Sequence, residues 1–173
     1  MIRLVRRAAA AEDGAAAIEF VLIFPVLFVL HVAAAEALEV YLAQRNVAHI
    51  AAAMADIVAQ SRTVTTADLD DVLVASTAMI HPFPNVSLQQ RVSSLSANAT
   101  GTVTTDWTVN KNYTVAGSPT APSGYLLANE SAIVTDVIYD YKPTFGLFLP
   151  KTLRFTRHAY VRPRLSPKVE KTS

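Results

Sequence analysis

Two residues near the N-terminus, Gly14 and Glu19, have the types and the spacing for chemistry at a membrane. Glu19 lies in an apolar run from Ala15 to Ala35, in which His31 is the only other ionisable residue. Placing an ionised side chain at mid-membrane raises the free energy of insertion by about 2.5–3.5 kcal/mol, and by less near the interface. A carboxylate in this run therefore predicts a functional residue with an oppositely charged partner. Cleavage after Gly14, the only glycine among the first hundred residues, would create a cationic α-amine on Ala15.

This amine would supply the partner that the carboxylate needs. It would lie four residues before Glu19, about 6 Å away along a helix axis, so that Glu19 sits slightly deeper in the membrane than the amine of its own chain. A neighbouring subunit displaced along the axis could bring its own amine to this carboxylate and neutralise both charges within lipid. The residues therefore predict a contact between subunits, made by Glu19 and the adjacent Phe20.

The segment Gly-Ala-Ala-Ala-Ile-Glu-Phe at residues 14–20, followed by an apolar run that contains Pro25, resembles the processing site of type IV pilin-like precursors. It is most similar to that of the TadE/TadG-like pseudopilins of tight-adherence (Tad, or Flp) pili. The resemblance implies that a prepilin peptidase cuts between Gly14 and Ala15, and that Glu19 is required for assembly. It also implies the remaining partners, which are other Tad pilins and pseudopilins, an inner-membrane assembly platform and the lipid bilayer.

Two other interpretations of the same segment stay open. A single-pass anchor could carry an incidental glutamate near the interface. A cleavable secretory signal would have a shorter apolar core and a small-residue cleavage site after it, whereas here the helical pattern continues well beyond the apolar run.

The pattern of apolar residues predicts one long helix over residues 15–61. Residues 15–35 are apolar on all sides and long enough to cross a bilayer, and we expect Pro25 to kink or locally melt this part. Beyond Ala35 the helix becomes amphipathic, which predicts that its second half packs on a folded head. The apolar residues expected to make this contact are Val47, Ile50, Met54 and Ile57.

Charge predicts the orientation of the chain. Residues 1–14 form a basic leader with Arg3, Arg6 and Arg7, so the N-terminus is expected in the cytoplasm and the remainder is expected to be exported. Residues 62–163 would form a periplasmic α/β head, and residues 164–173 a flexible tail. Together with the resemblance to Tad pseudopilins, this orientation implies a single-pass protein of a bacterial inner membrane, with the extracellular pilus as a further location after assembly.

The head is expected to contain a short helix that Thr66 caps and that ends before His81-Pro82-Phe83-Pro84. From Val86 onward apolar residues recur with a period of two, which predicts four antiparallel strands and an α+β, pilin-like fold. The second of these strands is expected to present one apolar face made of Val103, Thr105, Trp107 and Val109.

The loop 143–150 is the best candidate for a further contact, because it carries the large apolar residues Phe145, Leu147 and Phe148. The alternative is that this loop folds back over an exposed sheet edge or an open core. A second loop, at residues 116–124, is rich in proline, glycine and serine, and little order is expected there.

Composition excludes several classes of function. The chain has no cysteine, so disulfide bonds and thiolate metal sites are impossible, and a net charge of +1 argues against nucleic acid as a partner. The histidines have no partners at metal-ligand spacing, and we find no phosphate loop, carboxylate dyad or nucleophile–base pair. We therefore expect no cofactor and no enzymatic activity.

The preferred interpretation is a minor pseudopilin, a structural component required for the assembly of Tad pili in adhesion or secretion. A chain of 173 residues is too short for the additional large domain of TadG-like members and longer than the major Flp pilins, which favours a TadE-like component. The leading alternative is an inner-membrane-anchored periplasmic binding module that no prepilin peptidase processes, and an enzyme anchored by the helix is the third interpretation.

Overall fold

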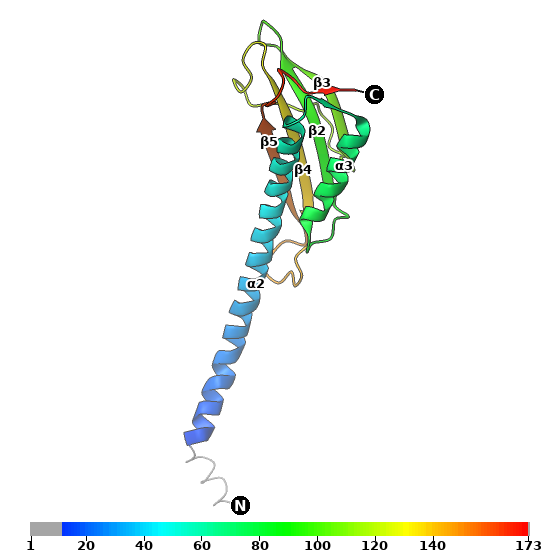
Figure 1. Ribbon diagram of the computed structural model, residues 1–173. Helices are drawn as coiled ribbons and strands as arrows, with labels where there is room; N and C mark the ends of the chain where they lie inside the picture. Colours follow the sequence, from blue (N-terminus) through cyan, green and yellow to red (C-terminus); the bar gives the residue numbers. More distant parts are fainter. Residues whose placement is uncertain (1–11, 173) are drawn as a thin grey trace, which may run out of the picture.

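Figure 1 shows the computed structural model of the protein, in which a long helix leads into a head built around a β-sheet. The structure describes residues 12–172. This is the expected α+β, pilin-like arrangement of a long N-terminal helix, a four-stranded antiparallel sheet and one short helix. The elements in chain order are α2 (Glu12–Ala59), β1 (Thr63–Val64), α3 (Thr66–Thr77), the 3-10 helix η1 (Ala78–Ile80), β2 (Leu88–Ala97), β3 (Val103–Lys111), β4 (Ser131–Tyr141), β5 (Leu153–Val161) and β6 (Glu170–Lys171).

The main sheet has the strand order β3-β2-β4-β5, with every neighbouring pair antiparallel. Val92 of β2 pairs with Thr135 of β4, and Tyr139 of β4 pairs with Phe155 of β5. In this register alternate residues of each strand face α2, because side chains of a strand alternate between the two faces of its sheet. The upper half of α2 lies over β4 and β5, and α3 lies beside it toward β3 (Figure 1).

The core lies between α2 and the sheet. Val47, Ile50 and Met54 are fully buried there, as expected from the sequence. Alanines 43, 51, 55 and 59 on the same side of α2 let the helix approach the sheet closely, and the Thr135 hydroxyl donates a hydrogen bond of 2.7 Å to the Ala51 carbonyl. The remaining residues packed in this core include Val58, Leu69, Leu73, Ile80, Leu88, Val92, Ile133, Val137, Tyr139, Tyr141 and Val169.

Ile57 does not belong to this contact, and the expectation that it packs on the head is wrong. Its side chain is 51% exposed, whereas Val58 is 1% exposed. Successive helix residues are separated by about 100°, so the buried stripe continues from Met54 to Val58, four residues on, and leaves Ile57 at its edge.

Both ends of α2 also differ from expectation. Helix α2 extends from Glu12 to Ala59, so it begins before the expected cleavage site and ends two residues early. It continues through Pro25 without interruption, and Figure 1 shows no sharp bend in that view, so the expected local melting is absent.

Thr65, not Thr66, caps α3: its hydroxyl accepts a bond from the Asp68 amide, and the Asp68 carboxylate accepts one from the Thr65 amide.

The β2–β3 pair contains an irregularity that divides the expected apolar face of β3. Ser94 pairs with Trp107 and Leu95 pairs with Thr105, so Asp106 is an extra residue in β3. Because an extra residue reverses the alternation of side chains, Val103 and Thr105 lie on the face opposite to that of Trp107 and Val109. Trp107 and Val109 pack against the core, whereas Val103 is exposed.

The C-terminal segment packs across the head, so the expectation of a flexible tail is wrong for residues 164–172. Val169 is fully buried, and its carbonyl accepts a bond of 2.9 Å from the indole of Trp107. Strand β6 pairs with β1 in a small parallel sheet, and the Arg164 amide donates to the Ala59 carbonyl. One buried apolar side chain, hydrogen bonds from side chains and backbone, and the Arg164–Asp56 ion pair hold the segment, although its prolines and charges are typical of a mobile tail.

Candidate functional site

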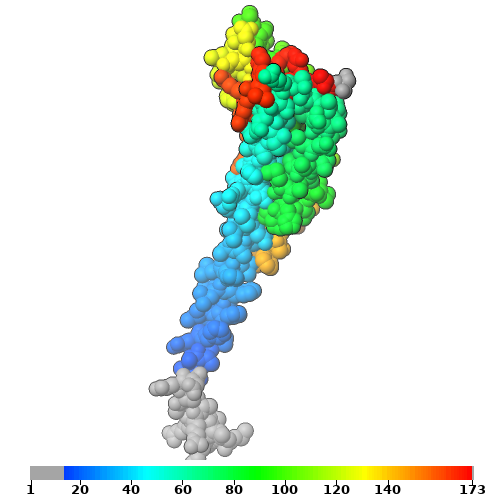
Figure 2. All heavy atoms as spheres, viewed as in Figure 1, coloured from blue at the N-terminus to red at the C-terminus, as the bar shows by residue number. Residues whose placement is uncertain are grey.

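The lower half of α2 is bare. Every residue from Ala15 to His31 is exposed, and Figure 2 shows this part of the helix standing clear of the head. The most apolar stretch has a mean hydropathy of 2.4 over 18 residues, of which only 6% is buried. By length and composition α2 could therefore be a single membrane span or a signal anchor.

The residues of the expected processing site all lie on this helix. Gly14 is half-buried, Ala15, Glu19 and Phe20 are exposed, and the backbone from Gly14 to Ala15 is helical. A peptidase that binds an extended backbone would have to unwind the helix locally. Gly14 lowers the free energy needed for this, because glycine disfavours a helix by about 0.8–1.0 kcal/mol relative to alanine.

Phe20 belongs to an aromatic row along the bare half. The rings of Phe20 and Phe24 are 5.5 Å apart between centroids, and those of Phe24 and Phe28 are 6.0 Å apart. The spacing of four residues places them one above another on the helix surface. Their faces and edges stay exposed, so this row is available to lipid or to another helix.

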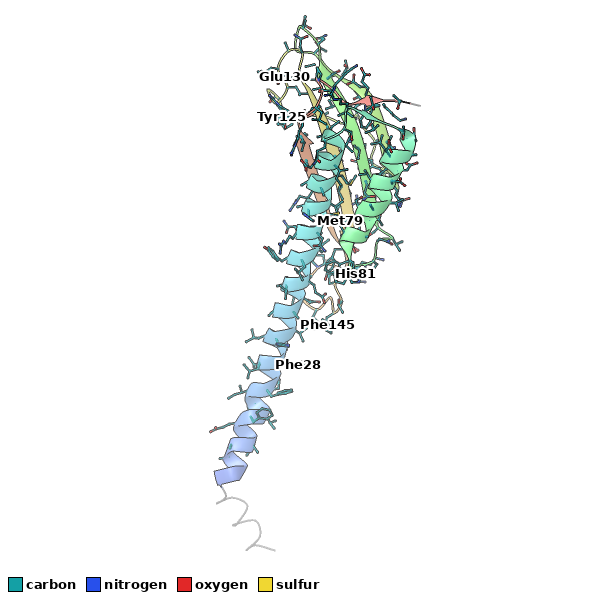
Figure 3. The ribbon with its side chains drawn as sticks, viewed as in Figure 1. Phe28, Met79, His81, Tyr125, Glu130 and Phe145 are labelled. Atoms are coloured by element: carbon teal, nitrogen blue, oxygen red, sulfur yellow. The ribbon has the colours of Figure 1, made fainter. Side chains whose placement is uncertain are left out.

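A second candidate surface is the loop between β4 and β5. Phe145, Leu147 and Phe148 are 57%, 65% and 57% exposed, so the loop does not fold these side chains back over the core. Figure 3 places Phe145 beside α2, between the head and the turn that carries Phe28. The loop therefore lies at the junction between the bare and the packed halves of the helix.

Hydrogen bonds to two glutamates of α2 hold this loop against the helix. The backbone amide of Gly146 donates to the Glu36 carboxylate. The Thr144 hydroxyl donates to Glu39 at 2.8 Å, and the Tyr141 hydroxyl donates to the same Glu39 oxygen at 2.9 Å. Burial, together with the bond to the Glu39 carboxylate, raises the pKa of Tyr141 above its usual range.

Glu36 is a residue of this contact that the sequence interpretation missed. It is 1% exposed, and its second carboxylate oxygen has no hydrogen-bond partner among the described residues. Val32, Glu36, Val40 and Ala43 recur at steps of four and three, so the buried stripe begins earlier than expected and includes this carboxylate. A glutamate at helical spacing within an apolar stripe was the available signal.

A pocket of about 570 Å³ opens beside the same loop. Its walls combine aromatic rings with two carboxylates that already have hydrogen-bond partners, which suits an apolar side chain of a partner. The lining residues are Glu39, Pro82, Phe83, Pro84, Val86, Ser87, Tyr139, Asp140, Tyr141, Lys142 and Thr144.

The sheet face opposite α2 carries a charged cluster that sequence spacing did not reveal. Asp136 is 3% exposed and accepts bonds from Arg91 at 2.7 Å and from His158 Nδ1 at 2.6 Å. Arg91 also donates to the Gly117 carbonyl and lies 4.4 Å from the centroid of the Tyr113 ring. These contacts join three strands to Gly117 at the start of the loop 116–124.

The Asp136–His158 pair has the orientation of an acid that positions a base, but the third member of a catalytic triad is missing. No serine or threonine hydroxyl within residues 12–172 is hydrogen-bonded to His158. Over the same residues, no group of three or more histidine and carboxylate side chains is placed to hold a metal ion. The arrangement does support a structural role for the pair.

No protein-family model, curated protein or solved structure matches this chain.

Proposed function

We propose that this chain is a minor, TadE-like pseudopilin, a structural component that is processed by a prepilin peptidase and assembled into Tad pili. The observation that carries the proposal is the position of Gly14 and Glu19 at the start of a helix half that is bare from Ala15 to His31. A helix exposed on all sides needs lipid or like helices around it. The resemblance of residues 14–20 to a pilin processing site adds the order of events, with cleavage first and assembly second.

The proposed orientation places the arginine-bearing N-terminus in the cytoplasm and the head in the periplasm of a bacterial inner membrane. After cleavage the helix would begin at Ala15, and its new amine would meet the Glu19 carboxylate of a neighbouring subunit. The exposed aromatic row of Phe20, Phe24 and Phe28 is available for the packing of pilin helices in lipid and later in the filament. The proposed role requires neither a cofactor nor catalysis by the chain itself.

Processing is the direct test. We expect co-expression of the full chain with the cognate prepilin peptidase to remove residues 1–14, so that N-terminal sequencing starts at Ala15. Gly14→Val should block this cut, because a β-branched side chain crowds the backbone that the peptidase approaches and restricts its conformation. An intact N-terminus, or a cut elsewhere, would contradict the pseudopilin proposal.

The second candidate function is an anchored binding module, and the pocket of about 570 Å³ next to Glu39 is the observation that favours it. Such a module would keep its leader and would act as a single copy. An unprocessed chain that retains a partner through this pocket would therefore support the module and contradict the pseudopilin.

A further inference from the structure

We propose that the loop 143–150 is a second membrane contact, which inserts Phe145, Leu147 and Phe148 into the headgroup boundary of the leaflet on the head's side. This inference rests on the membrane placement of α2 in the proposed function. It also explains why the loop 143–150 exposes large apolar side chains, which the pilin-like arrangement alone does not. The proposed partner of these side chains is a lipid surface.

The height of the loop along α2 is the first argument. The apolar run from Ala15 to Ala35 is about 31 Å long as a helix, which matches the ~30 Å hydrocarbon core of a bilayer. The Gly146 amide is bonded to Glu36, the residue that follows this run directly. The tip of the loop therefore lies where the span ends.

The burial of Val32 is the second argument. It is 7% exposed, although it lies within the apolar run and directly follows a series of exposed residues that ends at His31. The 143–150 loop is bonded to Glu36, one helical turn beyond Val32, and Figure 3 places Phe145 beside α2 between the head and Phe28. Because the loop extends alongside a residue of the span itself, a bilayer around the span would reach the loop.

The chemistry of the loop fits an interface. Its three large apolar side chains point away from the core, and two exposed lysines, Lys142 and Lys151, flank them. Apolar side chains at the acyl boundary with cationic side chains at the level of the phosphates are the arrangement of interfacial membrane anchors. Gly146 has a φ of +63° at the tip, which turns the chain so that the loop stays short and presents both neighbouring side chains.

The bonds to α2 make this contact a rigid one. Glu36 and Glu39 hold the loop through Gly146 and Thr144, and Tyr141, the last residue of β4, donates to Glu39 as well. The single helix α2 fixes the position of the head at the membrane. Insertion of the loop would in addition fix the tilt of the sheet relative to the membrane. A head held at two points would stand in one orientation before it joins other subunits.

The test uses the absence of cysteine from the chain. Single variants Leu147→Cys, Leu22→Cys and Leu127→Cys of the full chain are labelled with an environment-sensitive fluorophore and placed at one copy per lipid nanodisc. Leu127 is the matched control, since it is an exposed leucine (62%, against 65% for Leu147) in the segment between Tyr125 and Glu130, at the end of the head far from the span (Figure 3). Leu22 reports on the span.

We expect a blue shift of the emission at position 147 and a loss of fluorescence with lipids brominated near the headgroup. Position 22 should lose fluorescence with lipids brominated deep in the acyl chains, and position 127 should respond to neither. A probe at position 147 that behaves like the one at 127, with position 22 quenched, would overturn the loop insertion and leave the membrane span intact.

Three further outcomes are informative. A probe at position 147 that becomes shielded only when several copies share a disc, without quenching by lipid, would overturn the lipid contact in favour of a neighbouring subunit. Absence of quenching at position 22 would overturn the membrane placement, and with it both proposals. Normal lipid quenching at both positions in a chain that no prepilin peptidase processes would support the loop insertion and contradict the pseudopilin.

Discussion

The two halves of α2 contain similar apolar residues, yet one half is bare and the other is the centre of the core. From Ala15 to His31 every side chain is exposed, whereas Val47, Ile50 and Met54 are fully buried. The lower half is apolar all around, so no single covering surface could bury it, and it requires a surrounding medium. The upper half has one apolar stripe, which one sheet face covers. The comparison indicates that the stability of the head and the contacts of the lower half are separable.

The largest effect is expected for Ile50→Asp, which would place an unpaired carboxylate in the core of the upper half. Loss of the buried side chain together with burial of a charge should lower the free energy of unfolding by more than about 3 kcal/mol. Trp107, the only tryptophan, is a convenient fluorescence probe of thermal unfolding for the full chain in detergent.

Ile57→Asp is the matched control on the same helix. Since Ile57 is 51% exposed, the free energy of unfolding of this variant should lie within about 0.5 kcal/mol of that of the parent protein. Equal destabilisation by the two variants would show that the buried stripe is wrongly assigned.

Glu19→Ala tests the other half of the comparison. It removes the carboxylate of the bare half, so it should leave the thermal unfolding of the head and processing after Gly14 unchanged. Incorporation with other pilins should be lost, as measured by crosslinking between subunits or by counting pili. Glu19→Gln should behave in the same way, because it keeps the hydrogen-bonding shape and removes the charge that would pair with the Ala15 amine. Normal assembly of both variants would make Glu19 a passive residue and would favour the anchored module.

The C-terminal segment provides a further test of the upper half, because its Val169 is buried in the same core. Val169→Ala removes two buried methyl groups and should lower the free energy of unfolding by about 2 kcal/mol. Leu165→Ala is the control, since Leu165 is 55% exposed in the same segment, and it should have little effect. Similar small effects of the two variants would mean that residues 164–172 contribute nothing to the core, as expected of a free tail.

The smallest effect is expected at the start of α3. Thr65→Ala removes the side-chain cap of this helix and should cost about 1 kcal/mol, whereas Thr66→Ala removes no cap bond and should be nearly neutral. The measurement is again thermal unfolding, and a larger effect of Thr66→Ala would return the cap to that residue. Neither variant should alter processing or assembly, because both residues lie in the head.

Local patterns were sufficient for much of the fold. Steps of three and four predicted the buried contact of Val47, Ile50 and Met54, and the period of two predicted the four strands of the main sheet. Local patterns did not predict the Asp106 bulge, because no sequence signal there shows that β3 has one residue more than β2 between matching pairs. For the same reason Trp107 and Val103 were placed on one face, although they lie on opposite ones.

The candidate site also contains some features that local patterns predicted and others that they did not. Gly14, Glu19 and the apolar run are neighbours along one helix, so their spacing in the sequence is already their spacing in space. The bonds from the 143–150 loop to Glu36 and Glu39 join residues more than a hundred positions apart, and only the folded sheet brings them together. The same holds for Asp136 with Arg91 and His158, which meet across three strands.

The sequence by itself determined the features that depend on neighbours within one element: the long helix, its apolar first half, the position of Glu19 within it, and the strand periodicity. Tertiary structure alone decided the burial of Glu36, the packing of Val169 and the height of Phe145 beside α2. The physical reason is that the geometry of a helix or strand repeats every few residues, so it is reflected in the spacing of apolar and polar residues along the sequence. Contacts between distant segments depend on register and on strand order, which are set by the packing of the whole head.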